Sequence, residues 1–423
     1  MILSTFRKPF VVLLTVPASI ALGIGLLPLV TVFLERQFAR DAFSPFVLQF
    51  SVESAHTLLS VVATGAMTAL SLAYSLVLVV FTLAAGNIGP RLLQRFTSEL
   101  VNQITAGILG GTFLYAILTL LMTQPNFVPK ITIFGAVLLA IISVLQLIYF
   151  VRHVSQSVSV DDEIAQITKR ITKQLNDLQR TSNPDGKTPA RSKFKHDICA
   201  QKAGYVGWFD EDYLTEIAKK HDLMIWVEVS SGGFVLAGQN VAQVAGDADD
   251  DVLESIRKHI TIENARSEDR SPEFSINLLV EIALRALSPG INDTYTALAV
   301  ANSFSNAFAE IAEADTAPIL TIDDDGDLRL ILPAMSMEEL LGQAFHPIRL
   351  ATAGNILMAQ GFARALARLY VVGGKEMRKL VKEHAGLLMQ SLEASDHFDH
   401  DLQRVRACFP EALKSSGKNT AKS

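Results

Sequence analysis

The sequence predicts an α-helical membrane domain of four transmembrane helices, followed by a cytoplasmic α+β domain with a small β-module and a mainly helical C-terminal part. The distribution of charge is the first reason. Residues 1–151 hold only 7 of the 37 Lys and Arg residues and 4 of the 43 Asp and Glu residues in this chain of 423 residues. The second reason is that this charge-poor part contains four apolar stretches long enough to cross the roughly 30 Å hydrocarbon core of a bilayer.

These stretches are predicted to be transmembrane spans because of their length and their flanks. The first is free of charge over residues 11–33 and is too long for the apolar core of a secretory signal. The third and fourth are separated by a short turn that contains Pro125 and Pro129, so we expect them to form an antiparallel pair. The predicted spans cover approximately residues 11–33, 57–85, 101–123 and 131–151.

The Lys and Arg residues near the spans predict the orientation, because basic loops tend to stay in the cytoplasm. With the N-terminus inside, the inside set is Arg7, Lys8, Arg91, Arg95, Arg152, Lys169, Arg170 and Lys173, and the outside set is Arg36, Arg40 and Lys130. Both termini and the charged domain are therefore expected in the cytoplasm.

The predicted spans carry no Asp, Glu, Lys or Arg near their centres, which argues against a proton relay, a voltage sensor and ion-coupled transport. Small hydroxylated residues recur at helical spacing in the second span, namely Ser60, Thr64, Thr68, Ser71 and Ser75. Such a stripe lines a water path or forms a close helix-packing face, and the packing interpretation is favoured. The GxxxG spacing of Gly107 and Gly111 has the same two interpretations.

Residues 152–195 are expected to form an amphipathic helix and a basic linker. Acidic residues 161–163 favour a helix start, and one face of the helix is apolar: Ile164, Ile167, Ile171, Leu175 and Leu178. This face pairs with the same helix of another subunit or docks on its own domain. The residues that follow are typical of a linker near anionic lipid: Lys187, Arg191, Lys193 and Lys195.

Residues 196–246 alternate short strands with turns, which predicts a small β-module. The segment 234–244 resembles the glycine turn of barrel-sandwich hybrid modules, the small β-units of lipoyl domains. The exposed turn carries no Lys to which a lipoyl or biotinyl group would be attached. A structural barrel-sandwich-like module is therefore expected rather than a cofactor carrier.

Residues 247–412 are predicted to be a mainly helical domain that contains a β-hairpin at about 318–333, and residues 413–423 a disordered tail. The acidic hairpin turn 323–327 lacks the glycine position and the bidentate Glu of a calcium-binding loop. His397 and His400 are three residues apart on one predicted helix, but no second ligand pair accompanies them, so a hydrated surface is preferred to a metal site.

No catalytic, cofactor or metal motif is recognised in the sequence, so we expect no enzyme activity and no cofactor. The two cysteines, Cys199 and Cys408, are far apart and form neither a disulfide framework nor a metal pair. The acidic balance of the charged domain argues against nucleic acid as a partner.

The segment 285–293 is the one candidate site in the cytoplasmic part, and it comprises Arg285, Ser288, Pro289, Gly290, Asn292 and Asp293. As a structural corner, Pro289 ends one helix, Gly290 takes a positive φ, and Asn292 or Asp293 caps the next helix. As a ligand site, the free N–H groups of the second helix and Arg285 would bind an anion.

Three segments are similar to one family of bacterial predicted membrane proteins, grouped as domain of unknown function 2254. They are 87–103, 204–206 with the module that follows, and 285–293, of which the last is the most specific. The chain departs from the family pattern at Gly89 and Thr294, where Ser and Pro are usual. The resemblance implies a multi-pass protein of a bacterial inner membrane and implies no activity.

Two functions are compatible with these features. The first is an oligomeric channel or passive transport protein with a cytoplasmic regulatory domain, in which the hydroxylated stripe of the second span lines the path. The alternative is a membrane-anchored ligand-sensing or scaffold protein without transport activity. The expected partners are the lipid bilayer and further copies of the chain, and the ligand is unknown.

Overall fold

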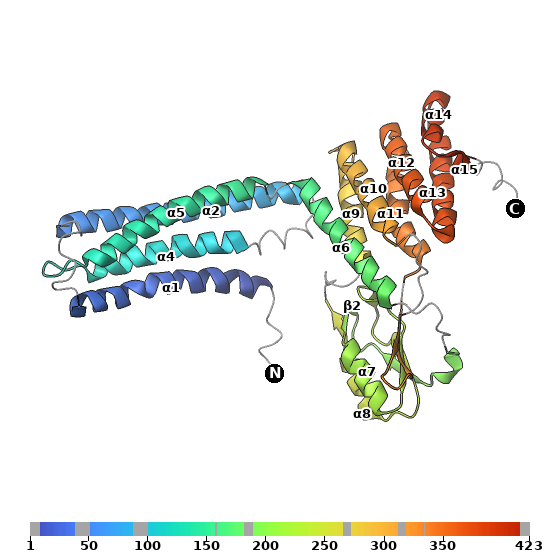
Figure 1. The fold of residues 1–423 in the computed structure, drawn as a ribbon, viewed down its shortest axis with the longest axis horizontal. Helices are drawn as coiled ribbons and strands as arrows, with labels where there is room; N and C mark the ends of the chain where they lie inside the picture. Colours follow the sequence, from blue (N-terminus) through green and yellow to red (C-terminus); the bar gives the residue numbers. More distant parts are fainter. Residues whose placement is uncertain are drawn as a thin grey trace. The chain divides into compact units, whose positions relative to one another are not determined.

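The computed structural model describes residues 9–38, 51–87, 100–156, 159–181, 189–264, 272–311, 319–333 and 335–414. The chain divides into two compact units, Met1–Ser159 and Val160–Ser423 (Figure 1). The motif residues 88–96, the start of the basic linker and the predicted tail beyond Lys414 lie outside the described residues.

The first unit is built from long apolar helices. In its described residues these are α1 (Pro9–Phe38), α2 (Val52–Asn87), α4 (Leu100–Met122) and α5 (Lys130–Gln156). Each contains a stretch long and apolar enough to cross a membrane. Helix α2 begins five residues before the predicted span, because Ser51 caps it by accepting a hydrogen bond from the N–H of Ser54 at 3.1 Å.

Helix α4 packs against the three other described helices of this unit. Its contact with α1 is close because glycines remove side chains from the interface. A Cβ atom on Gly107 would lie 2.7 Å from the Cβ of Ile20, and one on Gly111 would lie 2.7 Å from the Cβ of Ile24. Because both residue numbers increase together, α1 and α4 run parallel, as the first and third of four alternating spans must.

The second unit begins with α6 (Val160–Thr181), the predicted amphipathic helix. Four residues of its apolar face are buried, namely Ile164, Ile167, Ile171 and Leu175. The helix packs on α9 (Pro272–Ala286) and α10 (Thr294–Ala309) of the same unit. Docking on its own domain, rather than pairing with a second subunit, therefore accounts for this face.

The β-part contains two sheets. The larger has the order β1 (His196–Cys199), β5 (Asn240–Ala245), β3 (Met224–Val227), β8 (Leu328–Leu332) and β7 (Ile319–Ile322). The smaller has the order β4 (Phe234–Val235), β2 (Gly204–Phe209) and β6 (Ile260–Glu263). The short helix η2 (Arg191–Lys193) precedes β1, and helices α7 (Glu211–Lys220) and α8 (Asp250–Lys258) complete this part.

The predicted β-module at 196–246 contains one helix, α7, and its two sheets include strands from outside this range, namely β6, β7 and β8. The hairpin at 318–333 forms as β7 and β8, but β8 pairs in parallel with β3 and extends the same sheet. The reason is a shared core, since Leu330 and Leu332 of β8 are buried in one cluster with Ile225 of β3 and Val244 of β5.

The remaining helices are α11 (Met337–Thr352), α12 (Ile356–Val372), α13 (Lys375–Glu393), α14 (Asp399–Ala407) and α15 (Glu411–Lys414). Helices α9 to α13 lie side by side (Figure 1). Their core is aromatic. The ring of Phe345 on α11 lies 6.1, 5.8 and 5.5 Å from the rings of Phe304, Phe308 and Phe362, which are all fully buried.

Candidate functional site

The hydroxylated stripe of α2 faces away from the other helices of the first unit. Ser60, Thr64, Thr68, Ser71 and Ser75 are all exposed. The buried residues of α2 include Ala55, Leu59, Ala63, Ala66 and Ala73. At about 100° per residue these two sets lie on opposite sides of the helix. The stripe is therefore not a packing face toward the described helices of its own chain.

The hydroxyl groups of this stripe are partly satisfied within α2. Ser71 donates to the carbonyl oxygen of Met67 at 3.0 Å, and Ser75 donates to the carbonyl oxygen of Ser71 at 2.9 Å. Large apolar side chains flank the stripe, and Val61, Leu72 and Val79 are 66%, 65% and 57% exposed. The exposed surface of α2 is thus divided into an apolar part and a narrow hydroxylated part.

A second polar set, which no sequence motif indicates, lies between the spans. The hydroxyls of Thr112 on α4 and Ser143 on α5 are 2.9 Å apart, and Gln146 of α5 donates to the Thr105 hydroxyl at 2.8 Å. These groups are paired across helices because hydrocarbon offers no hydrogen-bonding alternative. They hold α4 against α5.

One acidic residue at the end of a span has a structural role. The carboxylate of Glu35 on α1 accepts from the backbone N–H of Ile131 at 3.1 Å and of Thr132 at 3.4 Å. These are N–H groups in the first turn of α5, where a negative charge is favourable. Glu35 therefore caps α5 and ties it to α1.

The segment 285–293 forms the corner between α9 and α10. The hydroxyl of Ser288 donates to the carbonyl oxygen of Arg285 at 2.6 Å. The N–H of Asp293 donates to the carbonyl oxygen of Ala286 at 2.7 Å. The positive φ belongs to Asn292, at 51°, and not to Gly290. Asn tolerates this region because its short polar side chain fits the left-handed conformation.

Asp293 is the residue that caps α10. Its carboxylate accepts from the N–H of Thr296 at 3.1 Å and from the Thr296 hydroxyl at 2.6 Å. These hydrogen bonds hold the pKa of Asp293 below its ordinary value. Arg285 lies 3.8 Å from Glu281 on its own helix. The cap already places a carboxylate at the positive end of α10, so this geometry fits a structural corner better than an anion site.

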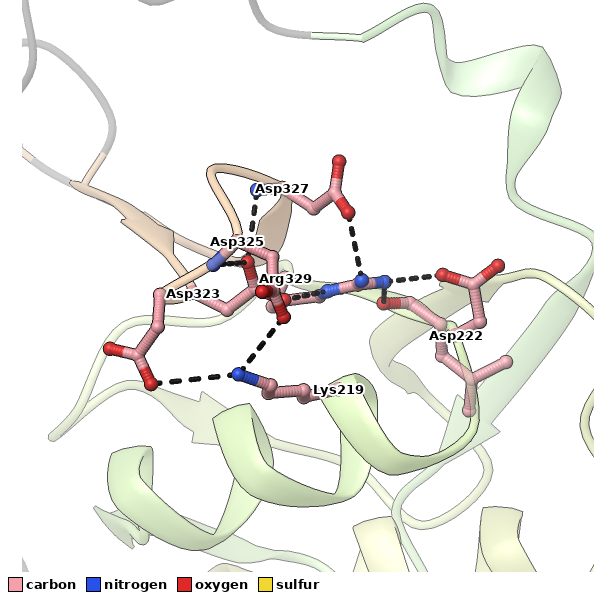
Figure 2. Close-up of polar contacts among 8 residues, drawn as sticks. Lys219, Asp222, Asp323, Asp325, Asp327 and Arg329 are labelled. Atoms are coloured by element: carbon pink, nitrogen blue, oxygen red, sulfur yellow. Dashed lines mark hydrogen bonds and ion pairs between the residues drawn. The ribbon is translucent and has the colours of Figure 1, made fainter.

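The acidic hairpin turn surrounds an arginine (Figure 2). Arg329 of β8 donates to the carboxylates of Asp323 and Asp222, both at 2.7 Å, and to that of Asp327 at 3.2 Å. Asp222 lies at the turn between α7 and β3 and has a φ of 52°. The cluster therefore fastens the hairpin to the turn that precedes its parallel partner strand.

Protein cations and backbone N–H groups offset the negative charge of this acidic turn. The guanidinium of Arg329 and the N–H groups of Asp327 and Asp325 lower the pKa of Asp323 to about 2. The ammonium group of Lys219 lies 3.1 Å from Asp325 and 3.5 Å from Asp324. Within the described residues, no group of three or more His, Cys, Asp or Glu side chains could hold a metal ion.

His397 and His400 do not converge on a common ligand position. His397 is hydrogen-bonded through Nε2 to the carbonyl oxygen of Ala353 at 2.6 Å, while His400 is exposed on α14. The contact of His397 ties the start of α14 to the turn between α11 and α12.

A buried histidine was not singled out by the sequence. His384 of α13 is 5% exposed and lies against α11, with its ring 5.6 Å from that of Phe345 and 4.7 Å from that of His346. Burial, together with the nearby His346 and Arg349, lowers the pKa of His384 to about 4. His384 is therefore neutral near pH 7, and its Nδ1 atom is buried with no hydrogen-bond partner among the described residues.

Comparisons with known proteins agree with this architecture. The family model described as "Predicted membrane protein (DUF2254)" matches residues 11–368. The chain is similar to "Uncharacterized protein Rv1290c" of Mycobacterium tuberculosis and "Uncharacterized protein Mb1321c" of Mycobacterium bovis. Each is 27% identical over 310 residues, which is 70% of this chain and 60% of the relative. The chain thus matches about 60% of the length of these relatives, and no solved structure matches it.

The family match covers the four apolar helices, the β-part and the helical part through most of α12. The protein is a membrane protein, and the chain belongs to the DUF2254 family of predicted membrane proteins.

Proposed function

We propose that the protein is an oligomeric channel or passive transport protein, in which the hydroxylated stripe of α2 lines a water-containing path between copies. The single observation that supports this function is the side of α2 on which the stripe lies. Ser60, Thr64, Thr68, Ser71 and Ser75 extend along the span on the side opposite the buried face of α2. A second copy can complete a path there, whereas Thr105, Thr112, Ser143 and Gln146 on α4 and α5 are hydrogen-bonded to one another.

The chemistry of the stripe suits passive movement. Hydroxyl groups that donate to carbonyl oxygens of their own helix keep lone pairs that can accept hydrogen bonds from water or solutes. Near the centre of the described spans there is no charged side chain to couple movement to an ion gradient. The protein would thus lower the energy barrier to crossing the membrane without catalysing a reaction. The second unit would regulate the opening of the path.

We further propose that the protein lies in the bacterial inner membrane, with both termini in the cytoplasm. The basic residues near the spans support this orientation, and the parallel packing of α1 and α4 is compatible with it. Reporter fusions after residues 45, 126 and 200 test it. The first two should report a periplasmic position and the third a cytoplasmic one. A periplasmic signal at residue 200 would refute the orientation.

The test of the path uses single cysteines in a background in which Cys199 and Cys408 are replaced by Ser. Cysteines at Thr64, Thr68 and Ser71 should react in the membrane with a small hydrophilic thiol reagent. Matched cysteines at Val61, Leu72 and Val79, which are exposed on the apolar part of the same helix, should react much more slowly. Conductance or solute flux in proteoliposomes, blocked by modification of the stripe cysteines, would support transport.

The same variants distinguish the alternative function. If the stripe cysteines are inert to the reagent but form disulfides between two copies, the stripe is a dry contact between subunits. With no flux in proteoliposomes, the protein would then be a membrane-anchored sensor or scaffold. Inert cysteines, no disulfides and no flux would refute both the path and the contact.

A further inference from the structure

A groove in the second unit carries a separate inference. It has a volume of about 500 Å³ and lies between α6 and α10, which pack against each other. Its polar lining consists of Thr168, Lys169 and Thr172 on α6 and Asn302, Ser303 and Asn306 on α10. The volume is within the range of small-molecule sites, and the residues converge from two helices rather than from one.

The groove presents hydrogen-bond donors that have no partner among the described residues. The hydroxyls of Thr172 and Ser303 and the amide of Asn306 make no hydrogen bond with a described residue, whereas the hydroxyl of Thr168 donates to the carbonyl oxygen of Ile164 at 2.6 Å. Asn302 accepts from Arg368 through its carbonyl oxygen, which leaves its NH₂ group as a further donor.

The charge of the groove selects an anion. Lys169 makes no ion pair with a described residue, and none of the described residues that line the groove is acidic. Arg368 of α12 brings a second cation to the rim through its hydrogen bond to Asn302. Several separate donors with two cations match the oxygens of a phosphate better than the two oxygens of a carboxylate.

Helix α6 follows the last apolar helix of the chain after a short connection. Helix α5 ends at Gln156 and α6 begins at Val160. Lys169 is nine residues further on, which corresponds to about 14 Å of helix. A phosphate at this groove has two sources, the headgroup of an anionic phospholipid and a soluble phosphate compound.

We propose that the groove between α6 and α10 binds a phosphate group. Lys169 provides the charge, and the donors on α10 orient the phosphate oxygens. The site does not depend on the α2 path, so either proposal can fail without the other.

Binding is tested with the full-length protein and the variants Lys169→Gln and Lys173→Gln. Lys173 is the matched control because it is exposed on α6, one turn further on, and does not line the groove. The probe for the soluble source is inorganic phosphate, titrated by calorimetry. The probe for the lipid source is phosphatidylglycerol, counted by native mass spectrometry after extraction from nanodiscs of phosphatidylcholine with and without it.

Loss of one charge-assisted hydrogen bond should weaken binding about tenfold or more in Lys169→Gln and leave Lys173→Gln close to wild type. This pattern with inorganic phosphate identifies a soluble ligand, and the same pattern with phosphatidylglycerol alone identifies a lipid headgroup. Equal effects of the two variants would show attraction to a basic surface and overturn the proposal. Absence of binding to both probes would also overturn it.

Discussion

The glycines of α4 give the sharpest prediction for the membrane unit. Replacing Gly107 by Ala places a Cβ atom 2.7 Å from the Cβ and 2.8 Å from the Cγ2 of Ile20. Carbon atoms in contact prefer separations of about 3.5–4.0 Å, so α1 and α4 must separate by up to about 1 Å. Overpacking of this kind costs about 1–3 kcal/mol, while Ala gains about 1 kcal/mol over Gly in helix propensity.

The control for Gly107→Ala is on the same helix. A Cβ atom on Gly110 would lie 3.5 Å from the Cβ of Ala21, which is an ordinary contact. Gly110→Ala therefore gains helix propensity without a clash and should be neutral or stabilising. The difference between the two variants isolates the cost of overpacking.

The assay must report on the spans, and intrinsic tryptophan fluorescence does not, because Trp208 and Trp226 are both in the second unit. Dyes on cysteines at Phe33 and Leu121, which are exposed on α1 and α4, would report their separation by energy transfer during SDS titration in mixed micelles. Gly107→Ala should lower the midpoint relative to Gly110→Ala. Equal midpoints would refute the close α1–α4 packing.

Three further predictions concern the second unit and use its tryptophan fluorescence in chemical denaturation. The pKa of His384 in the folded protein is about 4, below its ordinary 6.5. Its contribution of about 3 kcal/mol to the free energy of unfolding is therefore present above pH 6.5 and is lost as the pH falls from 6.5 to 4. His384→Leu should flatten this part of the pH profile of stability, whereas His400→Leu should not. Asp293→Ala should lower the free energy of unfolding by about 0.5–2 kcal/mol, and Asp293→Asn should lower it much less. Equal losses in the two variants would show that capping is not the role of Asp293. Arg329→Met leaves three carboxylates without their shared cation, so it should lower the midpoint of denaturation more than Lys219→Met does. The reverse order would contradict the central position of Arg329.

The sequence predicted the elements whose cause is local. The spans follow from apolar length, and the buried face of α6 follows from the spacing of Ile164, Ile167 and Ile171. The corner at 285–293 was also predicted, because Pro and a capping Asp act on adjacent residues. The choice of Asn292 instead of Gly290 for the positive φ was not predictable from residue type, since Gly adopts that conformation more easily.

Features that depend on distant residues could not be predicted in this way. Strand β8 pairs in parallel with β3, about a hundred residues earlier, and no local pattern in either strand specifies that partner. The sequence of the acidic turn departs from that of a calcium loop, but its contacts with Arg329 and the link of Arg329 to Asp222 required the folded sheet. His384 is similar, since only the packing of α13 on α11 buries it.

The direction of polar groups is the strongest reason to assign function to α2. In α4 and α5, Thr105, Thr112 and Ser143 find partners on the facing helix, so their presence is explained by the folding of one chain. The side chains of Thr64 and Thr68 are exposed, because they lie opposite the buried face of α2. Apolar residues at these positions would suit lipid equally well or better. Our proposal of a water path, and its alternative of contact with a second copy, therefore rest on a polar stripe that the described helices of its own bundle leave exposed.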